Sequence, residues 1–122
     1  MENIPSSSKT DGKKQLLSWV SKAIPSNLGI DVKDFGPSWR DGYAFMGLIN
    51  AIDENLIDIN EYRDVSNKHR LNTSFNVAES ELGIPKLLDP DDVDLAKPDE
   101  KSVMTYVAQF LQKYPEPKVS HI

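Results

Sequence analysis

The segment of residues 82–110, LGIPKLLDPDDVDLAKPDEKSVMTYVAQF, constrains the fold of this chain more than any other stretch. Gly83 can adopt the left-handed conformation that ends a helix, and Pro85 keeps that helix from resuming. Asp89 and Pro90 have the residue types of an N-cap and a first helical position, so a short helix is expected to begin there. The segment is therefore predicted to join the end of one helix to the start of another.

The same pattern recurs in Lys97-Pro98-Asp99-Glu100, before a longer helix. The apolar side chains expected on one face of that helix are Val103, Val107, Phe110 and Tyr114. A linker so rich in helix-ending and helix-starting residues positions helices for packing and partner contact. It carries no catalytic signature, so we do not expect an enzyme.

The composition argues against several kinds of site. The chain of 122 residues supports one domain, and it contains no cysteine and only two histidines, His69 and His121. Disulfides, thiolate metal sites and histidine-based zinc sites are therefore not expected, and no cofactor is predicted. The formal net charge of −5 argues against nucleic acid as the main partner. No apolar run approaches the roughly 20 residues that span a bilayer, and the N-terminus lacks a signal-peptide core, so a soluble, cytoplasmic protein is expected.

The chain divides into three predicted parts. Residues 1–12 are Ser-rich and aperiodic, which is typical of a flexible leader or an interdomain linker. Residues 13–114 form the predicted globular domain. Pro115 and Pro117 end the last helix, so residues 115–122 are expected to form a loose tail.

Helical periodicity within the globular part predicts an all-α fold with four main helices and short connecting helices. The first helix is expected over residues 11–24. The second is expected to begin near Ser38, whose hydroxyl can cap it while Asp41 occupies the third helical position. Its body, residues 42–52 (GYAFMGLINAI), is apolar nearly all round, which predicts a buried central helix. The third helix is expected to start after Ser66, and the fourth is the one that follows the acidic linker.

One core is predicted from the apolar faces of these helices, and its members are Trp19, Phe45, Leu48, Ile49, Phe75, Val107 and Phe110. Trp39 could serve as a ligand platform. A large aromatic residue before an apolar helix is more often part of the core, which is the preferred interpretation.

The acidic linker also matches part of a calcium-binding loop. Asp89, Asp91 and Glu100 fall at positions 1, 3 and 12 of such a loop. The loop requires glycine at position 6 and an oxygen ligand at position 5, where this chain has Asp94 and Val93. We therefore interpret these acids as helix-start residues, and no metal site is predicted.

The first helix carries a candidate binding face. Lys14, Ser18, Ser21 and Lys22, with Lys13 beside them, can share a face opposite the apolar stripe, because steps of three and four residues align on a helix. A basic stripe on an acidic protein could meet an acidic partner such as an actin filament or an anionic lipid headgroup. The alternative is a solvated helix face without a partner.

Four stretches together resemble a calponin-homology domain: DFGPSWRDGYAFMGLINAI, NLIDI, ELGIPKLLDPDDV and KPDEKSVMTYVAQF. They resemble in particular the second of the two domains in the tandem actin-binding region of spectrin, dystrophin, α-actinin and nesprin-type proteins. The resemblance covers residues 13–114, and its closing motif resembles the second-domain type. Residues 85–90 and 104–107 are most similar to the nesprin and spectrin style. Asn50 stands where the family often has histidine, and Asp53 and Glu54 replace an arginine–proline pair. These departures make the end of the central helix more acidic than is usual.

The resemblance implies a non-enzymatic module that links its parent protein to F-actin. In such tandems the first domain carries most of the filament affinity, whereas the second binds weakly alone, stabilises the first and can occlude its actin surface. The resemblance assigns filament contact to the first helix, with Lys13, Lys14, Ser18, Ser21 and Lys22 as the candidates. It places Asp99, Glu100 and Lys101 near the face presented to the adjacent first-type domain.

Some relatives in this family bind phosphoinositides through basic residues of the second domain, so a phosphoinositide is a further expected partner. The resemblance places such a module in the cytoplasm at the cytoskeleton, in a parent associated with a membrane or the nuclear envelope. A different function class remains open. A lone domain of this family can act as a scaffold that binds a signalling protein or a membrane phosphoinositide without direct actin binding.

Overall fold

A computed structural model describes residues 9–116, with side chains described from residue 12 onward; residues 1–8 and 117–122 lie outside the described part. The described elements are α1 (Lys9–Ala23), η1 (Ser26–Leu28), η2 (Pro37–Trp39), α2 (Tyr43–Ile52), η3 (Ile59–Tyr62), α3 (Asn67–Leu82), α4 (Pro90–Val93) and α5 (Glu100–Lys113). The four longer α-helices are joined by α4 and by the three 3₁₀ helices, η1 to η3. This confirms the predicted all-α fold, with no strand among residues 9–116.

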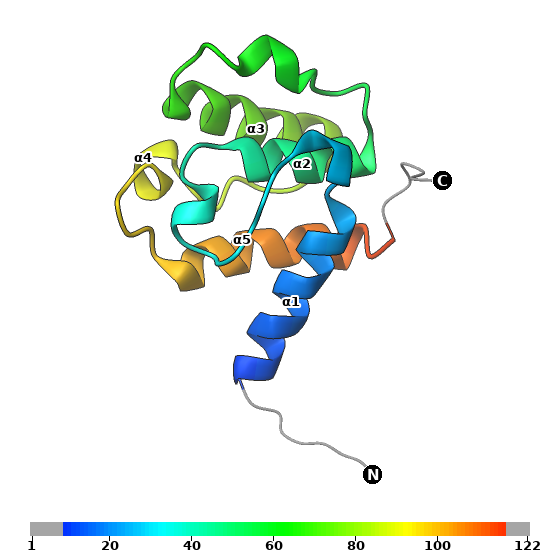
Figure 1. Ribbon diagram of the computed structural model, residues 1–122, viewed down its shortest axis with the longest axis vertical. Helices are drawn as coiled ribbons and strands as arrows, with labels where there is room; N and C mark the ends of the chain where they lie inside the picture. The colour runs from blue at the N-terminus through cyan, green and yellow to red at the C-terminus, as the bar shows by residue number, and fades with distance from the viewer. Residues whose placement is uncertain (1–8, 117–122) are drawn as a thin grey trace.

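Helix α2 lies at the centre of this arrangement. It packs against α3 on one side and α1 on another, while α1 crosses α5 (Figure 1). All of its residues except Tyr43 and Asn50 are buried, so the predicted central helix is confirmed. Gly47 permits the close approach of the loop after α1, because a Cβ atom there would lie 2.9 Å from Ile24 Cγ2 and 3.0 Å from Ile30 Cδ1.

An aromatic cluster fills the space between α2, α3 and α5. The centre of the Phe45 ring lies 5.1 Å from that of Phe75 and 5.6 Å from that of Tyr106, and both pairs have edge-to-face geometry. Trp39 is fully buried and 4.7 Å from Phe45, which confirms its interpretation as a core residue. Six of the seven predicted core residues are buried: Phe45, Leu48, Ile49, Phe75, Val107 and Phe110.

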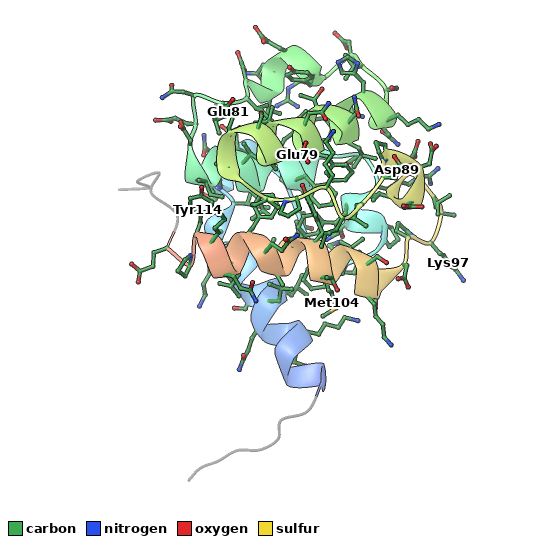
Figure 2. The ribbon with its side chains drawn as sticks, turned by 180° about the vertical axis from the view of Figure 1, so that it is seen from behind. Glu79, Glu81, Asp89, Lys97, Met104 and Tyr114 are labelled. Carbon is green, nitrogen blue, oxygen red and sulfur yellow. The ribbon has the colours of Figure 1, made fainter. Side chains whose placement is uncertain are left out.

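Trp19 is the exception, because it packs against this core without being fully buried. It is only partly buried at the margin, where its indole N–H donates to the Pro115 carbonyl at 3.0 Å. The indole needs an acceptor for its N–H, and the chain beyond α5 supplies one. On the same side of the domain the Tyr114 hydroxyl donates to the Leu82 carbonyl at 3.3 Å, which connects the end of α5 to the end of α3 (Figure 2).

The predicted start of the central helix at Ser38 is wrong. Ser38 lies in η2, and its hydroxyl oxygen accepts a hydrogen bond from the Lys33 backbone N–H at 3.1 Å. Helix α2 begins at Tyr43, directly after Gly42, whose φ is 88°. A Cβ atom on Gly42 would lie 2.7 Å from Arg70 Cβ, so the close approach of α3 requires glycine here. Asp41 therefore precedes the helix and is not its third residue.

The predicted start and end of α3 and the predicted start of α4 are confirmed. The Ser66 hydroxyl caps α3 by accepting from the His69 N–H at 3.1 Å, and Gly83 ends that helix with a φ of 71°. Helix α4 begins at Pro90, and α5 begins after its N-cap, Asp99. Helix α1 begins at Lys9, so the last four positions of the predicted leader, residues 9–12, belong to the helix.

A buried arginine ties the loop between α2 and α3 to the rest of the fold. Arg70 is 6% exposed, and its guanidinium stacks 4.3 Å from the centre of the Tyr43 ring. It donates hydrogen bonds to the carbonyls of Asp41 (2.6 Å), Tyr62 (2.8 Å) and Val65 (2.8 Å) and to the side-chain oxygen of Asn67 (2.8 Å). The charge is thus satisfied mainly by backbone oxygens, which holds residues 62–67 against the start of α2.

None of the helices described between residues 9 and 116 is both long and apolar enough to cross a membrane.

Candidate functional site

The predicted basic face of α1 is present at the surface. Lys14, Ser18, Ser21 and Lys22 are all exposed, whereas Leu16 and Val20 on the opposite side are buried. Among the side chains that are described, those of residues 12–116, no carboxylate lies within ion-pair distance of either lysine. Two exposed cations on one helix face provide a local positive surface on an otherwise acidic domain.

Lys13 is separated from this face by an ion pair. Its ammonium nitrogen lies 2.8 Å from Glu100 Oε1, so it joins the start of α1 to the start of α5. The two side chains keep 40% and 46% of their exposure, and such a pair contributes little to stability. The structure thus brings together one residue from each of the two predicted sites.

The predicted interdomain segment combines structural and exposed side chains. Asp99 Oδ2 accepts from the Ser102 hydroxyl at 2.6 Å and from the Ser102 N–H at 3.2 Å. These two bonds hold the pKa of Asp99 below its ordinary value, with the hydroxyl as the larger cause. Lys101 is exposed, and its backbone carbonyl accepts a hydrogen bond from the Thr105 hydroxyl at 2.8 Å. Asp99 is therefore primarily a helix cap, while Glu100 and Lys101 face outward.

The acids of the linker make contacts in different directions. Asp91 forms an ion pair with Lys68 of α3 at 2.6 Å. Asp94 Oδ1 accepts from Asn67 Nδ2 and from Arg40 Nε, both at 3.2 Å, and these bonds lower its pKa. Across residues 9–116 there is no group of three acidic, histidine or cysteine side chains arranged to hold a metal ion. The acids connect α4 to α3 and η2.

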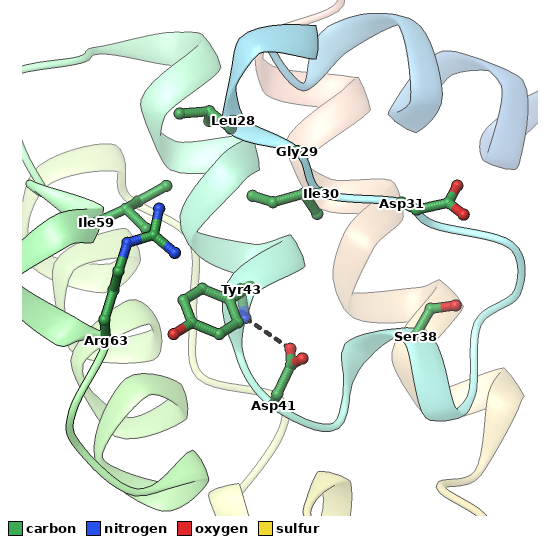
Figure 3. A pocket seen from close by; sticks show the side chains of 9 residues that line it. All are labelled: Leu28, Gly29, Ile30, Asp31, Ser38, Asp41, Tyr43, Ile59 and Arg63. Atoms are coloured by element: carbon green, nitrogen blue, oxygen red, sulfur yellow. Dashed lines mark hydrogen bonds between the residues drawn. The ribbon is translucent and has the colours of Figure 1, made fainter.

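A hollow of about 230 Å³ lies between the loop after α1 and the start of η3 (Figure 3). Leu28, Ile30 and Ile59 supply its apolar wall, and the Tyr43 ring and the Arg63 guanidinium stand beside them. Figure 3 also shows Asp41, whose carboxylate accepts from the Tyr43 N–H at 3.0 Å. Sequence reasoning missed this hollow, because its lining comes from four separate segments. The nine lining residues include no cysteine or histidine, and they offer no nucleophile–base pair.

A second hollow, of about 660 Å³, lies where α4 leads into α5. Its lining combines apolar residues (Leu88, Leu95, Pro98 and Val103) with the charged and polar residues Asp92, Lys97, Asp99, Glu100 and Ser102. Leu95 is 46% exposed and Leu87, one residue before this lining, is 54% exposed; they are the two exposed large hydrophobic residues of the described part of the chain. Sequence analysis had named only charged residues of this region, Asp99, Glu100 and Lys101, as candidates for partner contact.

The described part of the chain is an all-helical domain whose candidate residues lie on exposed parts of α1 and α5. A family model described as the calponin homology (CH) domain matches residues 10–116. The chain therefore belongs to the calponin-homology domain family, a non-enzymatic family, and the resemblance to this family seen in the sequence is confirmed.

Individual relatives agree with this assignment. The chain is 62% identical over 110 residues to muscle-specific protein 300 kDa of Drosophila melanogaster, which covers 90% of this chain and 1% of that protein. It is 51% identical over 100 residues to nesprin-2 of Mus musculus, covering 82% of this chain and 2% of the relative. It is 45% identical over 103 residues to calmin of Homo sapiens, covering 84% of this chain and 10% of that protein. The chain thus spans a small part of the length of each of these relatives.

Proposed function

We propose that this domain is an actin-binding module, the second calponin-homology domain of a tandem that links its parent protein to actin filaments. The family assignment and the nesprin-2 and calmin relatives support a cytoskeletal role. The closing motif KPDEKSVMTYVAQF, which resembles the second-domain type, supports the position in the tandem. On this proposal the domain works in the cytoplasm at the cytoskeleton, within a parent associated with a membrane or the nuclear envelope.

The observation that carries the proposal is the exposed basic face of α1. Actin filaments are strongly acidic, and this domain has a net charge of −5, so long-range attraction between the two is not expected. Attraction must come from a local patch, which Lys14 and Lys22 supply. Ser18 and Ser21 lie between them and can donate hydrogen bonds to acidic side chains.

We also propose that the adjacent first-type domain contacts Glu100 and Lys101 at the start of α5. Glu100 already pairs with Lys13, so a first domain placed here would lie beside Lys13 of α1. This proximity gives a physical route by which a closed tandem weakens filament contact. Charge reversal in Glu100→Lys should release Lys13 and open the tandem, which raises filament binding. Unchanged tandem binding would argue against this contact.

Cosedimentation with actin filaments tests the main proposal. The isolated domain should bind with a Kd on the order of 100 µM or weaker, a free energy near −5 kcal/mol. Binding should fall as salt rises, because exposed charges are screened over about 10 Å at 0.1 M ionic strength. Fusion to a first-type domain should tighten binding, partly through effective concentration.

A matched pair of double variants identifies the face. Charge reversal at Lys14 and Lys22 should reduce the affinity of the tandem and leave its melting temperature nearly unchanged. Charge reversal at Lys33 and Lys86, which are exposed elsewhere, changes the net charge equally and should have a much smaller effect. Micromolar, salt-insensitive binding by the isolated domain, or equal effects of the two double variants, would contradict the proposal.

The alternative function is a scaffold that binds a membrane phosphoinositide or a signalling protein without actin. The same basic face favours it, because two exposed lysines on one helix also suit an anionic headgroup. Vesicles with and without phosphoinositide, sedimented with the tandem, separate the two functions. Vesicle binding that depends on Lys14 and Lys22, without filament binding by the tandem, would favour the scaffold.

A further inference from the structure

The hollow at the junction of α4 and α5 has the features of a docking groove for a partner of defined chemistry. Its lining residues fall between Leu88 and Val103. Asp89 and Lys97, which belong to this segment, lie at the end of the domain opposite Tyr114 (Figure 2). Leu88, Pro98 and Val103 form a buried apolar floor. The groove is thus distinct from the basic face of α1, which lies along another helix.

Leu95 gives this groove an apolar anchor point. The residue is 46% exposed, although a leucine gains stability from leaving water. It lines the groove together with the buried floor, so a partner side chain resting on the floor would also cover Leu95. At the centre of a protein interface, an apolar side chain is typically buried and surrounded by contacts that exclude water. Leu95 would take this position once a partner covered it.

The rim of the groove is acidic. Asp92, Asp99 and Glu100 line it against a single cation, Lys97. Glu100 is paired with Lys13 and Asp99 caps α5, whereas Asp92 accepts only a long bond, 3.4 Å, from the Asp89 N–H. Asp92 has no ion-pair partner among the residues from 12 to 116 whose side chains are described. An acidic partner would be repelled here, while a cationic side chain would find an available carboxylate.

We propose that this groove binds a basic segment of a separate protein, in which an aliphatic or aromatic side chain lies between lysines or arginines. The apolar side chain packs on Leu95 and Val103, and a flanking cation meets Asp92. This segment is positively charged, whereas the ligand expected at the basic face of α1 is negatively charged. The domain can therefore hold an acidic partner at α1 and a basic one at this groove.

Fluorescence anisotropy on the full 122-residue chain tests the proposal. The probe is a short fluorescein-labelled peptide with two leucines flanked by lysines, and its counterpart carries glutamates in place of the lysines. The lysine peptide should bind, and the glutamate peptide should not. In NMR spectra the backbone amide signals of Leu95, Ser102 and Val103 should shift most on addition of the lysine peptide.

Two leucine variants distinguish the groove from general electrostatic attraction. Leu95→Ser should weaken binding of the lysine peptide by about five- to tenfold. Leu87→Ser removes a similarly exposed leucine outside the groove lining and should leave binding unchanged. Asp92→Asn should weaken binding and reduce its salt dependence. Melting curves of all variants verify that they remain folded.

Three results would overturn the proposal. They are failure of the lysine peptide to bind, equal losses in Leu95→Ser and Leu87→Ser, and equal binding of the glutamate peptide. The test does not involve actin, so its outcome is independent of the proposed filament binding. If an adjacent first-type domain in the tandem already protects the signals of Leu95 and Val103 and excludes the peptide, the occupant is that domain and not a separate protein.

Discussion

The buried guanidinium of Arg70 provides a sharp test of how this fold is held together. Replacing it with methionine keeps an unbranched, apolar side chain and removes all four of its hydrogen bonds, which are 2.6 to 2.8 Å long. A hydrogen bond to a charged group contributes about 1.5–3 kcal/mol. The four contributions are not additive, because the bonds share one side chain, and methionine avoids the cost of burying a charge.

We therefore expect Arg70→Met to lower the free energy of unfolding by about 3–4 kcal/mol, a large part of the 5–15 kcal/mol of a typical domain. Urea denaturation followed by circular dichroism measures this loss, with the m-value expected to stay near that of the wild type. Arg70→Lys keeps the charge but cannot reproduce the planar fork of donors, so we expect it to lose about 2 kcal/mol or more.

Arg63 supplies the matched control. Its guanidinium carbon also lies over the Tyr43 ring, but at 6.0 Å from the ring centre. The side chain is exposed, and its Nε donates a hydrogen bond to Asn60 Oδ1 at 3.0 Å. Arg63→Met should lower the free energy of unfolding by less than about 1 kcal/mol. Equal urea midpoints for Arg63→Met and Arg70→Met would refute the view that residues 62–67 are held by the buried guanidinium.

Four further outcomes are expected. Phe45→Ala, at the centre of the aromatic cluster, should cost about 3–5 kcal/mol, and unchanged melting would contradict the central place of α2. Tyr106→Phe should leave the melting temperature unchanged or raise it, because the Tyr106 hydroxyl is buried without a hydrogen-bond partner among the described residues; a marked fall would reveal an unrecognised partner. Ser102→Ala should lower the melting temperature at pH 7, and this difference should shrink below about pH 4. The reason is that the lowered pKa of Asp99 stabilises the fold above the unfolded-state pKa, and this stabilisation is lost as the pH falls through the folded-state pKa. Millimolar calcium should leave the melting temperature of the domain unchanged, whereas a saturable rise with calcium and not with magnesium would restore the calcium interpretation of the acidic linker.

The sequence determined those helix ends that depend on neighbouring residues. The cap at Ser66 and the left-handed Gly83 satisfy backbone groups within a few residues, so their local pattern predicted them. The same kind of pattern placed Asp99 in the first turn of α5, one position too far into the helix, because it is the N-cap. The central position of α2 was equally predictable, because a helix with no polar face has to be enclosed. The basic face of α1 followed from helical spacing alone.

Tertiary structure decided what depends on residues distant in the chain. The start of α2 is set by the approach of Arg70 to Gly42, a contact that the local capping pattern around Ser38 could not indicate. Lys13 was predicted to belong with the other lysines of α1, but the crossing of α1 and α5 places it beside Glu100, 87 positions away. The exposure of Leu95 likewise depends on how α4 meets α5. Capping and periodicity are local properties of the chain, whereas packing and ion pairing depend on which surfaces the fold brings together.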